Sequence, residues 1–259
     1  MNCCPPSSPY GEDELSLLNQ YFDDMTLEFK KMIRENYEKE VLLSQTQLKF
    51  LEQQINPHFL FNTLDSINWL AKKNRQAQIS VMVESLGNLL RASLNQDNDL
   101  IPIQEELAIL ESYVAIQRFR FADSLSVQFD VQETALPAMI PKLVLQPLVE
   151  NAITHSREDS DDPCEIRVRI CRKGDLVDVC VENNGPEIDV DILSKIRNGS
   201  VVPRGNGIGL INIDTRLCLI FGDAHGLSFA NRNGTVCVRF SIPFLTESPK
   251  RSVSESCIK

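Results

Sequence analysis

A histidine and an asparagine one helical turn apart carry the first chemistry that the sequence offers. His58 and Asn62 lie in "QQINPHFLFNTLDSI", residues 53–67, whose apolar spacing is that of an amphipathic helix containing Pro57. A neutral imidazole can attack phosphorus, and its charge state is tunable near pH 7. A histidine on an apolar stripe is by default a core residue, so this stretch alone leaves both roles open.

Two polar residues interrupt a second apolar helix pattern. Glu150 and Asn151 lie in "LQPLVENAITHS", residues 145–156. A carboxylate beside an amide could hold a hydrated Mg²⁺ through oxygen ligands. The alternative is a hydrogen-bonded structural role, because buried polar groups need partners.

Three closely spaced glycines precede a further helical run. Gly205, Gly207 and Gly209 belong to "RGNGIGLINIDTRL", residues 204–217. Glycines at a helix start let backbone N–H groups approach phosphate oxygens, and the helix dipole favours the negative charge. The pattern is not the dinucleotide fingerprint, because no strand ends directly before it and no βαβ unit follows. The turn formers of "ENNGPEI", residues 182–188, are most simply a surface turn.

The composition is that of a folded globular protein. The chain has 259 residues, 42% of them hydrophobic and 24% charged, which is enough for about two domains. The net charge of −10 gives no basic surface for nucleic acid. No window approaches the roughly 20 apolar residues of a membrane span, and the start lacks a signal peptide pattern. We therefore expect a soluble, cytoplasmic chain without a nucleic acid partner.

The eight cysteines favour reduced thiols over a disulfide framework, because no spacing is a paired CxxC and the chain is not a short secreted one. In three predicted strands, Cys171, Cys180 and Cys237 alternate with apolar residues. They share a face with charged side chains such as Arg169 and Glu182. This pattern predicts the outer face of a sheet rather than a metal site.

The first half of the chain has the pattern of long helices. Residues 13–73 contain an apolar seam that a single helix cannot bury, so we expect a parallel helix from a second copy of the chain. Pro57 would bend this long helix and expose the imidazole that follows it. A second helix is expected at 79–94, and the short loop before it predicts an antiparallel hairpin with the first helix. Two such hairpins, one from each copy of the chain, would form a four-helix bundle. A third helix, at 103–121, leads out of the bundle.

Beyond residue 123 the pattern changes to interleaved strands and helices. The segments 125–131, 164–185 and 226–244 alternate as strands and hairpins, and 141–156 has the pattern of a helix. This order predicts an α+β sandwich over about 124–245. The polar tail after it is expected to be disordered.

Four motifs in order resemble one family. The stretches "QINPHFLFNTLDSI", "LVLQPLVENAITHS", "VENNGP" and "GNGIGLINIDTRL" are similar to the phosphoacceptor, N, G1 and G2 boxes of the LytS/YesM-type sensor histidine kinases. The connecting stretch "LIPIQEELAILESYVAIQRFRF" is similar to the inter-domain segment of that family. The resemblance covers residues 13–245, and "GEDELSLLNQYFDDM" also resembles the second helix of a HAMP signalling module.

The resemblance implies a domain order. A HAMP-like signalling helix would occupy 13–45, and helices for dimerisation and histidine phosphotransfer, with the linker helix, would occupy 46–122. An ATP-binding domain of the Bergerat type, shared with gyrase and Hsp90, would occupy 123–245, before a disordered tail at 246–259. The implied fold class is α+β, an N-terminal helical dimerisation bundle followed by a Bergerat-type α/β sandwich.

The resemblance also implies a reaction. His58 would take the γ-phosphate of ATP and pass it to an aspartate on the receiver domain of a response regulator. Asn62 would orient the imidazole or a water, and Glu150 would take a proton or hold the imidazole. Asn151 would ligate Mg²⁺ and His155 would meet a phosphate oxygen.

The remaining implied nucleotide contacts come from the two glycine boxes and the last hairpin. These residues are Asn183, Gly185, Gly205, Gly207, Gly209, Leu210 and Thr235.

Two positions depart from the family pattern. The G1 box usually carries an aspartate that accepts a hydrogen bond from the adenine amino group, and Asn183 stands there. Its amide oxygen can accept the same bond, but the group is neutral and can present its NH₂ instead. Glu187 stands where the family has a glycine. The alternative function is therefore a nucleotide-degenerate dimeric scaffold or a response-regulator phosphatase, while a chaperone-type ATPase would lack the His58 bundle.

Overall fold

The computed structural model describes residues 25, 56–95, 99–156, 163–191, 195, 207–232 and 234–247. Contacts divide the chain into two units, 1–59 and 60–259. The expected HAMP-like helix, Gly205 and the end of the tail lie outside the described residues, apart from Met25. No helix in the described ranges is long and apolar enough to cross a membrane.

Helix α2, Pro57–Lys73, begins at the proline. Asn56 lies directly before the helix, and its side-chain Oδ1 accepts a hydrogen bond from the Phe59 N–H at 3.2 Å. Asparagine is a favoured N-cap, and proline suits the first helical position because its missing N–H would have no partner there. The described helix therefore starts at Pro57, and the longer helix that was expected to bend at this proline involves residues 51–55, which lie outside the described residues.

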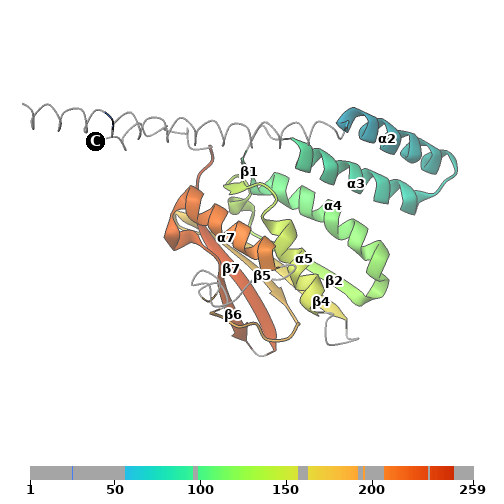
Figure 1. Ribbon diagram of the computed structural model, residues 1–259. Helices are drawn as coiled ribbons and strands as arrows, with labels where there is room; N and C mark the ends of the chain where they lie inside the picture. Colours follow the sequence, from blue (N-terminus) through green and yellow to red (C-terminus); the bar gives the residue numbers. More distant parts are fainter. Residues whose placement is uncertain are drawn as a thin grey trace, which may run out of the picture. The chain divides into compact units, whose positions relative to one another are not determined.

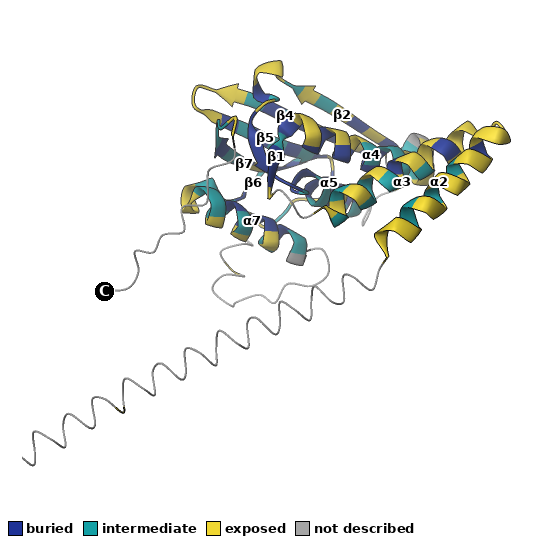
Figure 2. Ribbon diagram, turned by 90° about the horizontal axis from the view of Figure 1, so that it is seen from above, coloured by how far each residue is buried: buried dark blue, intermediate teal, exposed yellow. Residues whose placement is uncertain are grey.

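From Leu60 onward, α2 forms the expected antiparallel hairpin with α3, Ala77–Leu94. Asn68 links the two helices, since its Oδ1 accepts from Ser80 Oγ at 2.6 Å and its Nδ2 donates to Glu84 Oε1 at 3.1 Å. Lys72 lies 2.7 Å from the same carboxylate. Most of the surface of both helices is exposed in Figure 2.

Helix α4, Ile103–Phe121, connects the hairpin to the sheet domain. It follows strand β1, Leu100–Pro102, which pairs antiparallel with β3, Met139–Pro141. Its buried face repeats at helical spacing through Ile103, Leu107, Leu110 and Val114.

One mixed sheet of five strands forms the centre of the C-terminal domain. Its order is β2 (Leu125–Val131), β4 (Cys164–Lys173), β5 (Leu176–Asn183), β7 (Thr235–Pro243) and β6 (Ser228–Arg232). The β2–β4 pair is parallel and the other pairs are antiparallel. This arrangement confirms the predicted α+β sandwich.

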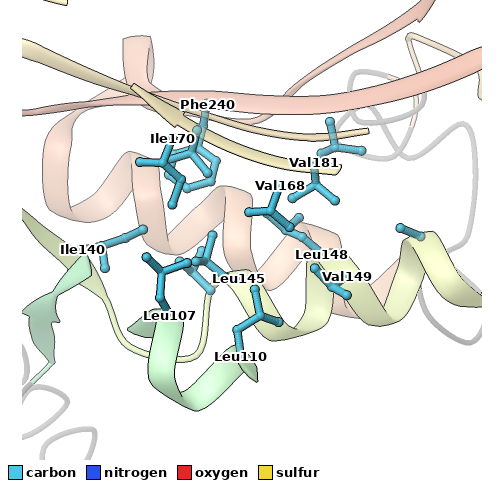
Figure 3. Close-up of a cluster of buried hydrophobic side chains, with 14 of the residues drawn as sticks. Leu107, Leu110, Ile140, Leu145, Leu148, Val149, Val168, Ile170, Val181 and Phe240 are labelled. Carbon is cyan, nitrogen blue, oxygen red and sulfur yellow. The ribbon is translucent and has the colours of Figure 1, made fainter. Parts of the chain in front are cut away.

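Helices α5, Leu145–Ser156, and α7, Gly207–Phe221, lie with α4 on one face of this sheet (Figure 1). Figure 3 shows Leu145 and Leu148 of α5 facing Val168, Ile170 and Phe240 of the sheet. Burying a side chain of this size contributes about 1.5–3 kcal/mol. The core therefore fixes α5 against the strands that carry the candidate site.

The other face of the sheet is polar, as the strand alternation predicts. Cys171, Cys180 and Cys237 line one hollow there together with Arg169 and Glu182. The expected reduced state is wrong for two of these cysteines, because Cys180 and Cys237 form a disulfide in the structure. Their Cα atoms are 6.5 Å apart owing to the register of β5 and β7, which the spacing of cysteines along the chain does not reveal.

Candidate functional site

A cavity of about 170 Å³ opens between α5 and the ends of β5 and β7. Two asparagines, a histidine and two carboxylates share it with apolar side chains. Its lining consists of Leu148, Asn151, Ala152, His155, Asn183, Pro186, Glu187, Ile188, Asp189, Val236 and Val238.

Asn151 is buried on α5 with one atom unsatisfied. Its Oδ1 is the only buried side-chain nitrogen or oxygen in the described part of the chain that has no hydrogen-bond partner. An unpaired buried acceptor costs about 1–3 kcal/mol. The same residue lines the cavity, so a ligand that offers a cation or a donor there would remove this cost. An amide oxygen is also a ligand type that Mg²⁺ accepts.

Asn183 ends strand β5 and is 4% exposed. Valines 177, 179 and 181 face the core, so the alternation of the strand turns Asn183 inward as well. Its Nδ2 donates to Ser156 Oγ at 3.0 Å. This contact directs the NH₂ of Asn183 to the end of α5 and leaves its carbonyl oxygen to accept a bond from a ligand.

Gly185 is required by the close approach of its turn to the end of α5. A Cβ atom at this position would lie 3.1 Å from both the backbone nitrogen and the Cα of Ser156, and 2.6 Å from Asn183 Nδ2. Backbone atoms cannot give way as a flexible side-chain end can. The glycine therefore lets the turn and α5 form one wall of the cavity.

The other predicted residues differ in where the structure places them. His155 is half-buried and lines the cavity, whereas Glu150 is exposed and does not. Leu210 of α7 is buried in the hydrophobic core. Thr235 lines a separate hollow with Arg167 on the other side of the sheet, while the next residue of the strand, Val236, faces the cavity.

The second glycine box coincides with the start of α7. Gly207 is its first residue and Gly209 lies in its first turn, where backbone N–H groups lack helical partners. A Cβ on Gly209 would meet nothing within 4 Å, so packing does not require a glycine there. Arg216 anchors the helix further on, because its guanidinium donates to Lys142 O at 2.5 Å and to Asp99 O at 2.9 Å.

Two supporting residues were missed by the sequence analysis. Asn231 of β6 accepts from the Ile188 N–H at 3.1 Å and donates to the Ile188 carbonyl at 2.7 Å, which fixes the loop after the G1 box. Asn231 pairs with the inward-facing Val236. The sequence feature that could have indicated it is an asparagine at a strand position where the alternation expects an apolar residue, as for Asn183.

Glu106 of α4 is the second. It is fully buried, and its carboxylate accepts the N–H groups of Leu143, Val144 and Leu145 at 2.8–2.9 Å, at the start of α5. Burial raises the pKa of the Glu106 carboxyl, and these hydrogen bonds lower it in part. Leu143 has a φ of 58°, a left-handed conformation that this anchoring holds in place. Nothing in the local sequence distinguishes Glu106 from the exposed Glu105.

The candidate phosphoacceptor lies on α2. His58 is exposed in the first turn of the helix, and Asn62 is exposed one turn later. The first turn of a helix favours negative charge, so a phosphoryl group on His58 would be stabilised there. Around the hairpin, several large apolar side chains are also exposed, among them Trp69 at 60% and Leu70 at 50%.

Two family models match separate parts of the chain. The histidine kinase family model matches residues 46–125, and the model for histidine kinase-, DNA gyrase B- and HSP90-like ATPases matches residues 138–246. Sensor histidine kinase YesM of Bacillus subtilis is 46% identical over 84% of this chain and 37% of its own length. Sensor protein kinase HptS of Staphylococcus aureus is 32% identical over 90% of this chain and 45% of its own.

The chain thus spans less than half the length of these curated relatives. Among solved structures, the catalytic domain of histidine kinase ThkA is 23% identical, covering 57% of this chain and 99% of its own, with a TM-score of 0.46. With one region that matches histidine kinases, a second that matches their ATPase domain, and 46% identity to a sensor kinase, the chain belongs to the sensor histidine kinase family.

Proposed function

We propose that this chain is the kinase part of a two-component sensor, which phosphorylates His58 from Mg-ATP and passes the phosphoryl group to an aspartate of a response regulator. The observation that carries the proposal is the unsatisfied Oδ1 of Asn151 in a cavity walled by Asn183 and His155. That cavity belongs to the region that matches ATPases, and His58 to the region that matches histidine kinases.

The cavity residues have distinct roles in this proposal. The Asn183 carbonyl accepts from the adenine amino group, since Ser156 occupies its NH₂. Asn151 Oδ1 ligates Mg²⁺, which when bound neutralises charge on the phosphates. His155 meets a phosphate oxygen. The N–H groups at Gly207 and Gly209 receive the triphosphate at the start of α7, together with Gly205.

Transfer needs an acceptor that can reach a bound nucleotide. His58 is exposed, as an acceptor must be, and Asn62 on the next turn orients its imidazole or a water. Glu150 is exposed next to Asn151 and takes the imidazole proton or holds the ring. Leu210 acts through packing of α7, and Thr235 supports the strand end beside Val236.

The proposal includes a domain order and a homodimer. We assign 13–45 to a HAMP-like signalling helix, 46–122 to dimerisation and phosphotransfer, 123–245 to the ATPase domain, and 246–259 to a tail. The exposed apolar side chains of α2 and α3 support a homodimer, because a helical hairpin cannot bury such a surface alone. A cytoplasmic location suits a protein that uses ATP, with any membrane contact made through a sensor region outside this chain.

Incubation with γ-labelled ATP and Mg²⁺ tests the proposal. The wild type should acquire an acid-labile label, and His58→Gln should lose it while keeping its affinity for a non-hydrolysable ATP analogue. Asp65→Asn, an exposed change two turns further along α2, should keep the label. Label that persists on His58→Gln would refute the acceptor assignment. Absence of any nucleotide binding by the wild type would favour the scaffold or phosphatase role that Asn183 and Glu187 leave open.

A further inference from the structure

A pair of cysteines on the outer face of the sheet lies close to the strand residues that line the proposed nucleotide cavity, but does not line the cavity itself. Cys180 of β5 and Cys237 of β7 are diagonal neighbours, because Cys180 pairs with Arg239 and Cys237 with Glu182. Their Cα atoms are 6.5 Å apart, within the usual range for disulfides, and the structure joins them. We propose that Cys180 and Cys237 form a reversible disulfide site that responds to oxidants.

The surroundings of Cys180 favour its reactive form. Its register partners are Arg169 on β4 and Arg239 on β7, so a cationic residue stands on each side of it. Arg169 also holds Glu182 at 3.2 and 3.3 Å, which reduces the repulsion between that carboxylate and a thiolate. Positive charge stabilises a thiolate, and the thiolate is the species that reacts with oxidants.

Access differs between the two cysteines. Both line a hollow of about 610 Å³, which is wide enough for a small oxidant. Cys180 is half-buried, whereas Cys237 is only 9% exposed. Cys180 is therefore the group that an oxidant reaches first, and Cys237 is the thiol that closes the bond. This combination of an accessible cysteine and an adjacent resolving one is typical of redox-sensitive sites.

The chemistry balances with a hydroperoxide as oxidant. The Cys180 thiolate attacks one peroxide oxygen, the O–O bond breaks, and with one proton the departing oxygen leaves as water or an alcohol. The sulfenic acid on Cys180 is then attacked by the Cys237 sulfur, the S–S bond forms and water leaves. The two sulfurs lose two electrons in total and the peroxide gains them. A dithiol reverses the reaction by thiol–disulfide exchange.

Closing the bond restrains the strands that wall the nucleotide cavity. Asn183 pairs with Val236, and this pair is the next one along the ladder from Glu182 and Cys237. Asn183, Val236 and Val238 all line the cavity. The disulfide holds β5 against β7 beside the cavity. A ligand then loses less binding free energy to ordering these strands. This consequence rests on the proposed nucleotide site, whereas the cysteine chemistry does not.

The test compares reduced and peroxide-treated full chain. Peptide mapping should show a Cys180–Cys237 bond, a mass loss of about 2 Da and recovery with dithiothreitol. The bond closes 57 residues of chain, so the melting temperature should rise by roughly 10 °C. Affinity for a non-hydrolysable ATP analogue should rise by about two- to fivefold on oxidation. Cys237→Ser should lose all three responses.

Cys171→Ser is the matched control, because Cys171 lines the same hollow and is not disulfide-bonded. This variant should keep every response. Arg239→Gln should slow the alkylation of reduced Cys180 about threefold at pH 7. Full alkylation of Cys180 and Cys237 after peroxide treatment would overturn the redox site. If mapping shows the disulfide but the affinity for the ATP analogue does not change, only the proposed effect on the nucleotide cavity is overturned.

A metal site is the competing outcome. In the structure the ligand atoms of Cys180, Glu182 and Cys237 lie within 4.8 Å of one another, a spacing that would suit a metal ion if both thiols were reduced. If stoichiometric Zn²⁺ protects both thiols from alkylation and peroxide then forms no disulfide, the redox proposal is overturned in favour of a zinc site. Unprotected thiols in the presence of Zn²⁺, with a disulfide after peroxide, support it.

Discussion

Asn183, which stands where the family pattern has an aspartate, has defined contacts on both sides of its amide. Asn183 presents its NH₂ to Ser156 and its carbonyl to the cavity. Asn183→Asp replaces a neutral acceptor by a charged one, and the Ser156 hydroxyl can turn to donate to the new carboxylate. Charge-assisted hydrogen bonds contribute about 1.5–3 kcal/mol against roughly 1 for neutral ones. Affinity for an ATP analogue should therefore rise about three- to thirtyfold, measured by calorimetry.

Burial of the new carboxylate offsets part of this gain, because the position is 4% exposed. Asn184→Asp is the control, since Asn184 is exposed and its Nδ2 donates to the Pro163 carbonyl. That variant should leave the affinity unchanged. An unchanged or weaker affinity of Asn183→Asp would mean that adenine does not bind at this amide.

A second prediction at the residue scale concerns Gly185. Gly185→Ala places a Cβ 3.1 Å from backbone atoms of Ser156, so the turn and the end of α5 must separate. Affinity for the ATP analogue should fall at least about tenfold, the effect of roughly 1.4 kcal/mol, and the cost of overpacking is typically about 1–3 kcal/mol. Gly87→Ala, a change inside α3, is the comparison. The added Cβ would lie 4.0 Å from the Leu64 side chain, which is ordinary van der Waals contact. Equal affinities of the two variants would contradict the close approach.

At the scale of elements, the start of α5 depends on a residue of α4. Glu106→Gln keeps the size of the side chain but replaces one acceptor oxygen by an NH₂ that faces a backbone N–H. The unfolding free energy measured in urea should fall by about 1–3 kcal/mol, the cost of an unsatisfied buried group. Because α5 carries Asn151, binding of the ATP analogue should weaken too.

Glu105→Gln is the matched change, one residue away and exposed. It should alter neither stability nor binding. If both glutamine variants unfold at the same urea concentration as the wild type, Glu106 does not anchor α5.

The same anchoring explains where the predicted helix differs from the observed one. The apolar pattern predicted a helix from residue 141, but α5 begins at Leu145. Residues 139–141 instead pair with β1, and Leu143 takes a left-handed conformation held by Glu106. A periodic pattern cannot show that backbone groups are taken by a residue 37 positions earlier in the chain.

At the scale of the whole molecule, the exposed apolar surface of the hairpin predicts self-association. Leu70 of α2 is 50% exposed, and Leu86 of α3 is 41% exposed. The double change Leu70→Ser and Leu86→Ser should shift the protein from dimer toward monomer at micromolar concentration, measured by light scattering. Removing each buried leucine from an interface costs about 2–5 kcal/mol by comparison with protein cores.

Leu176→Ser tests whether any exposed leucine has this effect, since Leu176 is 41% exposed on β5. This variant should remain dimeric. A wild type that is monomeric under the same conditions would refute the homodimer itself, including the apolar seam expected within residues 13–73, most of which lies outside the described residues.

The sequence by itself determined the order of the main helices and strands and the identity of the family. Strand 125–131 and helix 103–121 were predicted at the residues where the structure has them, because alternation and helical spacing are local properties of the chain. The outward face of Cys171, Cys180 and Cys237 followed from the same alternation. The motifs also indicated Asn151 and Gly185, whose settings in the structure fit a ligand site.

Only the tertiary structure decided how distant residues meet. The bond from Asn183 to Ser156 spans 27 positions, and the disulfide of Cys180 with Cys237 spans 57. Such contacts depend on strand register and on how α5 docks on the sheet, which are set by packing of the whole core rather than by any local pattern. For the same reason Glu106 and Asn231, which hold the walls of the cavity, could be found only after the elements that they join had been placed together.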